Sequence, residues 1–214
     1  MLQEDRTLLH DKDIREPLFD FLEETYGKIR ILEEKMMGRS RADVVMVTED
    51  AIYGVEIKSD ADSYTRLSRQ VKDYDKYYDR NIVVVGTTHA HSIKEHVPEW
   101  WGIITVEDIN GSLDFYFYRQ PEDNPKMDIK RKISILWRPE LVHIQELNGM
   151  SKYREKSKLF VSDKIIATVP SDILARQISE ELFQRDYTTI EETLNEYRKQ
   201  NTLKHQKRRS RRRK

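Results

Sequence analysis

The chain has 214 residues, with 38 Lys plus Arg balanced by 38 Asp plus Glu, and 37% of its residues are hydrophobic. This length and content suit one substantial hydrophobic core with a small second unit. No apolar run approaches the ~20 residues that a membrane-spanning helix needs, and the charged N-terminus does not resemble a signal peptide, so we expect a cytoplasmic protein with no membrane partner. The absence of Cys excludes disulfides and thiol chemistry.

The first half of the chain predicts one helix and three strands. Apolar residues recur at helical spacing from Ile14 to Tyr26, which predicts an amphipathic helix over 13–26 that ends at Gly27. Runs rich in β-branched residues predict strands over 28–35, 42–47 and 52–58, with a loop over 38–41 and a tight turn over 48–51.

The hairpin formed by the second and third strands carries acidic residues. If its turn is centred between Glu49 and Asp50, paired positions sum to 99, so Asp43 lies opposite Glu56 on one side of the sheet. Lys58, two residues beyond Glu56, shares that side. A one-residue slip of register would move Asp43 to the other side. The side away from the acids collects Val44, Met46, Tyr53, Val55 and Ile57, which we expect to face the core.

Two carboxylates and an ammonium group at one place suit a magnesium-dependent phosphodiesterase. Mg²⁺ takes oxygen ligands, usually one or two carboxylates with waters and substrate phosphate oxygens, and the main-chain carbonyl of Ile57 would add another. Lys58 would orient or deprotonate the attacking water, or neutralise charge on phosphorus. Mn²⁺ is an alternative ion, whereas zinc is disfavoured because Cys is absent and the six His lack a zinc-binding spacing. The competing interpretation is a solvated hairpin with an ordinary Glu–Lys pair.

A helix predicted over 63–78 follows the acidic hairpin. Arg66, Gln70 and Tyr74 recur every four residues, so they lie along one edge of this helix. A cation, an amide and a phenol on that edge would bind phosphate and support the acids, although a solvated helix flank gives the same pattern.

Arginines in two other places are candidates for contacts with nucleic acid. Arg39 and Arg41 lie in the loop beside the first acidic strand, where they would contact backbone phosphates. The last eleven residues, Lys204–Lys214, contain eight Lys or Arg and no acid, so the preceding residues carry an excess of eight acids. Such a tail is expected to be disordered and to bind nucleic acid by counterion release; a localisation signal, a membrane-surface anchor or a solubility feature are alternatives. The tail candidates are Arg208, Arg209, Arg211 and Arg212.

The remaining segments complete an α/β fold, a mixed sheet flanked by helices with a C-terminal helical appendage. Strands are expected over 81–88, 101–106 and 111–119, the last at an edge, with a short helix over 92–99, and helices over 137–147, 158–169, 171–186 and 189–200. We therefore divide the chain into a core over 1–120, a helical region over 121–200 and a basic tail over 201–214.

The pattern Asp43…Glu56-x-Lys58, followed by Gln70-x-x-x-Tyr74, resembles the PD-(D/E)XK nuclease superfamily and its restriction-endonuclease-like fold, in the RecB/Cas4-like branch. The stretch EIKSDADSYTRLSRQVKDYDKYYD also resembles a group of small bacterial and phage proteins of mostly unassigned role. The resemblance covers roughly residues 10–120. It implies that Asp43 and Glu56 are metal ligands, that Lys58 is the catalytic lysine, and that Gln70 and Tyr74 lie near the metal and the DNA.

The chain departs from the superfamily pattern at Ala42, where Pro is frequent before the first acid. Many members add an acid from the first helix, for which Glu16, Glu23 and Glu24 are candidates. We expect a metal-dependent nuclease that uses a metal-activated water, with DNA favoured over RNA. One alternative is a catalytically inactive nucleic-acid-binding or assembly protein that keeps the fold. Another is an unrelated α/β domain with a surface ion-pair cluster.

Overall fold

The computed structural model describes residues 9–185, apart from the side chains of 33–36. The chain divides into two compact units, Met1–Phe183 and Gln184–Lys214. The predicted helix over 189–200 and the basic tail lie outside the described residues. No helix among the described residues has the length and apolar content needed to cross a membrane.

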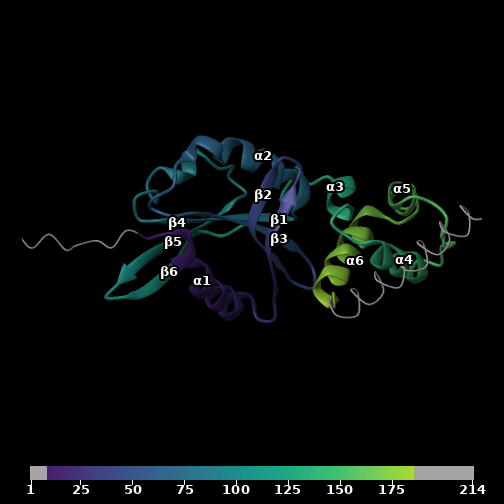
Figure 1. Ribbon diagram of the computed structural model, residues 1–214, viewed down its shortest axis with the longest axis horizontal. Coiled ribbons are helices and arrows are strands. Elements are labelled where there is room, and N and C mark those ends of the chain that lie inside the picture. Colours follow the sequence, from purple (N-terminus) through teal and green to yellow (C-terminus); the bar gives the residue numbers. More distant parts are fainter. Residues whose placement is uncertain (1–8, 186–214) are drawn as a thin grey trace, which may run out of the picture. The chain divides into compact units, whose positions relative to one another are not determined.

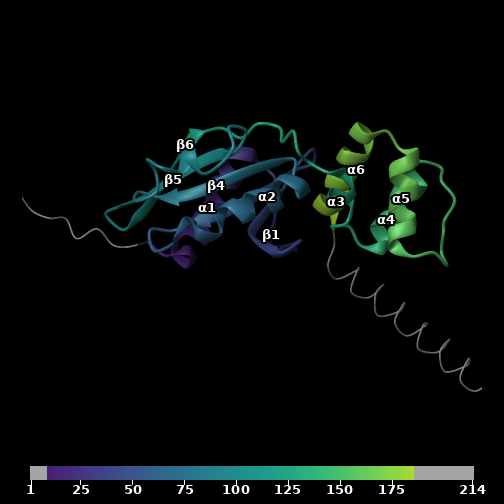
Figure 2. The same ribbon diagram turned by 90° about the horizontal axis from the view of Figure 1, so that it is seen from above.

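Six strands form one mixed sheet, in the order β1-β2-β3-β4-β5-β6 (Figures 1 and 2). The first three strands are antiparallel, β3, β4 and β5 are parallel, and β6 returns antiparallel to β5. The strands are β1 (Arg30–Met37), β2 (Ser40–Val47), β3 (Ile52–Lys58), β4 (Arg80–Gly86), β5 (Gly102–Ile109) and β6 (Ser112–Arg119). The predicted mixed α/β architecture and the edge position of the last strand are thus confirmed.

Helices cover both faces of the sheet and continue beyond it. They are α1 (Asp11–Tyr26), α2 (Leu67–Tyr77), α3 (Ile129–Ile133), α4 (Arg138–Leu147), α5 (Lys158–Thr168) and α6 (Ser171–Gln184), with 3-10 turns η1 (Tyr64–Arg66) and η2 (Ile93–Glu95). Figure 1 shows α1 and α2 on opposite sides of the sheet. Apolar residues of α1 pack on one face, whereas α2 and the C-terminal helices share the core on the other.

The hairpin register predicted from the turn is confirmed. Val44 pairs with Val55 and Val47 with Ile52, so paired positions sum to 99. The core on the α1 side of the sheet contains the five residues expected there, Val44, Met46, Tyr53, Val55 and Ile57. Because this face is apolar, a one-residue slip of β2 would place Asp43 in the core on the α1 side, which the cost of burying an unpaired charge disfavours.

The structure corrects the predictions for the 38–41 loop, for the start of the helix after the acidic hairpin and for the segment over 92–99. The 38–41 loop is shorter than expected, since Ser40 and Arg41 pair with β1 as part of β2. Arg66 belongs to η1 and not to the following helix. The expected helix over 92–99 is only the turn η2.

The first helix begins earlier than predicted but ends where expected. It starts at Asp11, because the main-chain N–H of His10 donates to Asp13 Oδ2 at 3.2 Å in a capping box. Gly27 ends it with φ of 75°, a conformation that favours glycine. This early start brings the first turn of α1 to the site described below.

Candidate functional site

A cleft of about 490 Å³ lies over the carboxyl end of β3. It receives side chains from α1, the β1–β2 hairpin, β3 and the start of α2. The lining residues are Asp11, Arg15, Arg39, Ser40, Arg41, Asp43, Glu56, Ile57, Lys58, Asp62, Arg66, Arg69 and Gln70. The cleft therefore gathers most of the site residues predicted from the sequence.

Glu56 forms the floor of the cleft and is fully buried. Lys58 Nζ and Gln70 Nε2 both donate to Glu56 Oε1, and the Tyr74 hydroxyl donates to Oε2 at 2.6 Å. Period-2 spacing on β3 brings Lys58 to the same side, and the four-residue spacing of Gln70 and Tyr74 on α2 aims both at one carboxylate. The predicted grouping of Glu56 with these three residues is present.

Tyr74 packs against aromatic residues in the core on the α2 side of the sheet. Its ring lies 5.4 Å from that of Trp101 and 5.5 Å from that of Tyr78, and Trp101 Nε1 donates to the buried Asp75 carboxylate at 2.8 Å. Burial, followed by the charge of Glu56, raises the pKa of Tyr74 well above its ordinary value. Tyr74 therefore remains a protonated donor to Glu56.

Asp43 lies at the point where β2 and β3 separate. The main-chain N–H of Ile57 donates to Asp43 Oδ2 at 3.0 Å, and Arg15 Nη2 lies 3.9 Å from Oδ1. Burial and then the negative charge of Glu56 raise the pKa of Asp43 to about 7, against the opposing effects of the Ile57 N–H and Lys58. The two carboxylates are thus close enough to repel each other.

These donors fit a hard cation such as Mg²⁺. Asp43, Glu56 and the Ile57 carbonyl offer oxygen, and a divalent ion would remove the carboxylate repulsion that raises the pKa of Asp43. Within residues 9–185, no group of three or more His, Cys, Asp or Glu side chains is arranged to hold a metal. An ion here would therefore complete its shell with waters and substrate oxygens, as Mg²⁺ usually does.

Arginines surround this acidic floor. Arg39, Arg41 and Arg66 line the cleft as predicted from the sequence, and Arg69, which was not singled out, joins them. Arg69 lies three residues after Arg66, a spacing that places both on one side of a helical segment. The tail arginines at 208, 209, 211 and 212 lie outside the described residues.

The first helix supplies different residues from those expected. The three candidate acids, Glu16, Glu23 and Glu24, are exposed and do not line the cleft. Asp11 and Arg15 do, and Arg15 Nε donates to Asp11 Oδ2 at 2.9 Å. No sequence signal distinguished these two, because their position depends on how α1 docks on the sheet.

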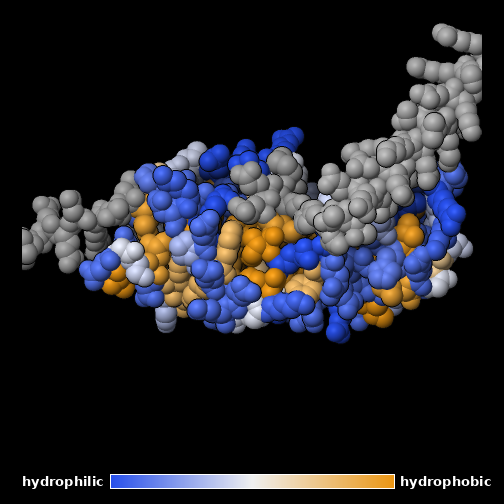
Figure 3. Space-filling model, turned by 60° about the horizontal axis from the view of Figure 1, so that its bottom comes forward, coloured by the Kyte–Doolittle hydropathy of each residue, from blue (hydrophilic) through white to orange (hydrophobic). Residues whose placement is uncertain are grey.

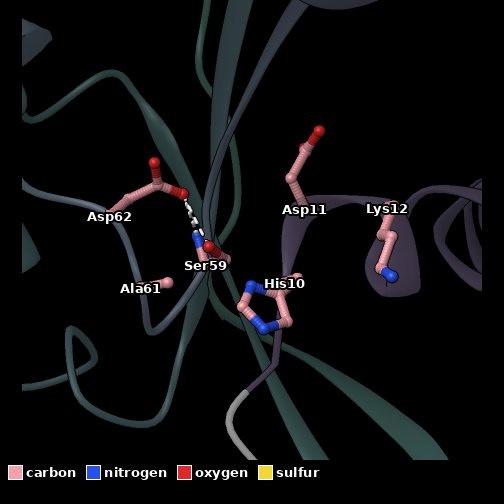
Figure 4. Close-up of a pocket in the computed structure, with 6 residues that line it drawn as sticks. All are labelled: His10, Asp11, Lys12, Ser59, Ala61 and Asp62. Carbon is pink, nitrogen blue, oxygen red and sulfur yellow. Dashed lines mark hydrogen bonds between the residues drawn. The ribbon is translucent and has the colours of Figure 1, made fainter.

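A second hollow of about 450 Å³ adjoins the cleft and shares Asp11 and Asp62 with it. Figure 4 shows His10 beside Ser59, with Asp11 and Lys12 at the start of α1 and Ala61 and Asp62 on the loop after β3. Asp62 Oδ2 accepts hydrogen bonds from the Ser59 N–H at 2.9 Å and from its hydroxyl at 2.6 Å, which fixes this loop. The cleft thus continues beyond the acids along the β3–α2 loop.

Replacing Gly54 is expected to disturb the floor of the site. A Cβ atom at Gly54 would lie 2.2 Å from Tyr78 Cδ2 and 2.5 Å from Tyr74 Cδ1, inside van der Waals contact. We expect Gly54→Ala to lower the free energy of unfolding by ~1–3 kcal/mol, as overpacking does, and to displace the Tyr74 hydroxyl from Glu56. Urea denaturation measures the loss, and wild-type stability would contradict this packing.

The raised pKa of Asp43 predicts a pH-dependent stability. Between its ordinary value of 3.8 and about 7, the folded protein holds a proton on Asp43 that the unfolded chain releases. The free energy of unfolding of metal-free protein should therefore fall as pH rises through this window, by up to ~1.4 kcal/mol per pH unit. Urea denaturation in EDTA should show this decline in wild type and a flatter profile in Asp43→Asn. Parallel profiles would contradict the assignment.

Comparisons with known proteins place the chain in a family. No curated protein matches it. Among solved structures, SfsA of Pyrococcus furiosus, solved in complex with Ca²⁺, matches at 14% identity with a TM-score of 0.34, over 58% of this chain and 68% of that one. A family model described as Bacteriophage P4 protein cII matches residues 4–210. Since this match spans nearly the whole sequence, the chain belongs to the Bacteriophage P4 protein cII family.

Proposed function

We propose that this protein is a metal-dependent nuclease that hydrolyses phosphodiester bonds, with DNA as the favoured substrate. The observation that carries the proposal is the buried Glu56 carboxylate, which Lys58, Gln70 and Tyr74 hold beside Asp43. Burying a carboxylate and an ammonium group costs several kcal/mol per ion before their attraction offsets it. Such charges in a cleft are typical of a site that uses them.

The proposal assigns a task to each polar group on the floor of the cleft. Asp43, Glu56 and the Ile57 carbonyl would hold Mg²⁺ or Mn²⁺, which lowers the pKa of a bound water and neutralises phosphate charge. Lys58 would orient the attacking water or stabilise charge on phosphorus. Gln70 Oε1 is buried and has no hydrogen-bond partner among the described residues, so it is placed to accept a hydrogen bond from a water in the cleft.

The rim supports an anionic polymer as substrate. Arg39 comes from the β1–β2 hairpin, Arg66 from η1 and Arg69 from the start of α2, and all three are exposed along the cleft. A guanidinium group can form two hydrogen bonds to the oxygens of one phosphate, in a bidentate geometry. Arginines on both sides of the acids would contact phosphates that flank the scissile bond.

Cleavage assays test the proposal directly. Purified protein is incubated with circular single-stranded, nicked and supercoiled DNA in Mg²⁺, Mn²⁺ or EDTA. We expect cleavage in Mg²⁺ or Mn²⁺ and none in EDTA, and cleavage of closed circles would identify an endonuclease. Binding to DNA without cleavage of any substrate would overturn the proposal in favour of a non-catalytic nucleic-acid-binding protein.

Metal binding gives a second readout that does not depend on activity. Mg²⁺ at about ten times its Kd should stabilise the wild-type protein by ~1.4 kcal/mol, seen as a rise in Tm at a pH above 7, where Asp43 is ionised. The Asp43→Asn variant should show a smaller rise. Equal rises in both proteins would mean that the ion binds elsewhere.

A further inference from the structure

β6 is an edge strand that lacks the usual features that prevent pairing with another strand. One side of β6 pairs with β5 from Ser112 to Arg119, and no strand among the described residues pairs with the other side. An edge strand offers a row of free N–H and C=O groups, which natural proteins usually protect with Lys, Pro or a bulge. β6 reads SLDFYFYR, so Asp114 is the one charged residue between its ends.

Large aromatic side chains project from both faces of this edge. Tyr116 and Tyr118 are 68% and 55% exposed. On the other face the rings of Phe115 and Phe117 lie 5.4 Å and 5.6 Å from Phe21 of α1. Figure 3 brings forward the face of the molecule on which α1 lies in Figure 1. On this face, orange hydrophobic patches lie between blue hydrophilic residues. The β6 edge therefore has exposed aromatic side chains on one face and aromatic side chains packed against α1 on the other.

The opposite edge of the same sheet differs. β1 reads RILEEKMM, in which charged residues are half the sequence, as expected of an edge that must remain unpaired. The difference in charge indicates that the β1 edge is suited to solvent, whereas the β6 edge is suited to contact another protein surface. A nucleic acid is a poor occupant for β6, because no basic residue lies between its ends to contact phosphate.

We propose that β6 pairs antiparallel with β6 of a second copy of this chain, symmetrically about Tyr116. A two-fold axis perpendicular to the sheet keeps each side chain on its own face, so opposed residues must have an even sum. In this register Tyr116 opposes itself, Phe115 opposes Phe117, and Asp114 opposes the hydroxyl of Tyr118. Aromatic pairs then meet on both faces and no like charges are opposed, which stabilises antiparallel pairing.

The pairing leaves the cleft free. The cleft lies at β3, and β4 and β5 separate that strand from β6. Two copies would form one continuous sheet with a cleft in each half. The proposal does not depend on the reaction performed in the cleft.

Sedimentation velocity of the full chain tests the association. We expect a wild-type dimer and a monomeric Tyr116→Lys/Tyr118→Lys variant, since lysines guard an edge and both positions are exposed. The control Leu159→Lys/Ile173→Lys changes two other exposed apolar residues, 72% and 45% exposed, and should remain dimeric. A monomeric wild type, or a dimer that persists in the tyrosine variant with an unchanged circular dichroism spectrum, would overturn the proposal.

Disulfide trapping tests the register. The chain has no Cys, so any cross-link comes from the introduced residue. Opposed Cβ atoms lie ~5 Å apart, close to disulfide distance, so Tyr116→Cys should form a covalent dimer under mild oxidation. Tyr118→Cys, opposite Asp114, and the exposed control Leu159→Cys should not. Failure of Tyr116→Cys to cross-link, or equal cross-linking at all three positions, would overturn the symmetric pairing.

Discussion

The Lys58→Met variant is expected to lose metal-dependent DNA cleavage by roughly 10²- to 10⁴-fold, the usual contribution of a positioned proton-transfer or charge-stabilising group. Lys58 is only 5% exposed, and its ammonium donates to Glu56 and lies 3.5 Å from the Ile57 carbonyl. No other lysine lines the cleft among the described residues. Methionine keeps the side-chain volume while removing the charge, so initial rates on circular DNA measure the loss of the ammonium group.

An exposed lysine on α2 gives a matched control. Lys72→Met removes a charge outside the cleft and should keep the wild-type rate. Both variants should bind DNA and give wild-type circular dichroism spectra, which separates loss of chemistry from loss of fold. Wild-type cleavage by Lys58→Met would rule out a role for the ammonium group and would point to a contaminating nuclease.

The Lys132→Met variant is expected to lower the free energy of unfolding by ~3–5 kcal/mol, the cost of breaking a buried ion pair from one side. Lys132 is fully buried, and its Nζ donates to Asp79 Oδ1 and to the Ala175 carbonyl, each at 2.7 Å, and to Ser179 Oγ at 3.2 Å. Burial lowers the pKa of Lys132 although Asp79 opposes this shift. The residue joins α3, α6 and the junction between α2 and β4.

Two further variants isolate this ion pair. Lys130→Met changes an exposed lysine two residues away and should cost less than ~0.5 kcal/mol. Adding Asp79→Asn to Lys132→Met should recover part of the loss, because the unpaired carboxylate is removed while an acceptor remains for the Ile52 N–H, now 2.7 Å from Asp79. Urea denaturation of wild type, Lys132→Met, Asp79→Asn and the double variant measures the coupling, and a loss below ~1 kcal/mol in Lys132→Met would contradict a buried pair.

Several features of the site followed from short-range periodicity. The hairpin register depended on one turn over 48–51 and on one apolar face, so Asp43 could be placed near Glu56 and Lys58 before any tertiary contact was known. The spacing of Gln70 and Tyr74 placed both on the side of α2 that meets the acids. Local spacing suffices in these cases because the two-residue repeat of a strand and the near four-residue repeat of a helix are fixed by backbone geometry.

Other features depended on how distant elements dock. Arg15 and Asp11 reach the cleft because α1 packs across the sheet, and the hairpin tip approaches α2 because the Ser40 hydroxyl donates to Asp73 at 2.6 Å. No signal in the sequence indicated that Lys132 is buried, because nothing in its local pattern differs from that of an exposed lysine. The sequence by itself determined which side chains share a strand face or a helix edge. Only the tertiary structure decided which of these surfaces meet, because contacts between remote segments depend on the packing of the whole core.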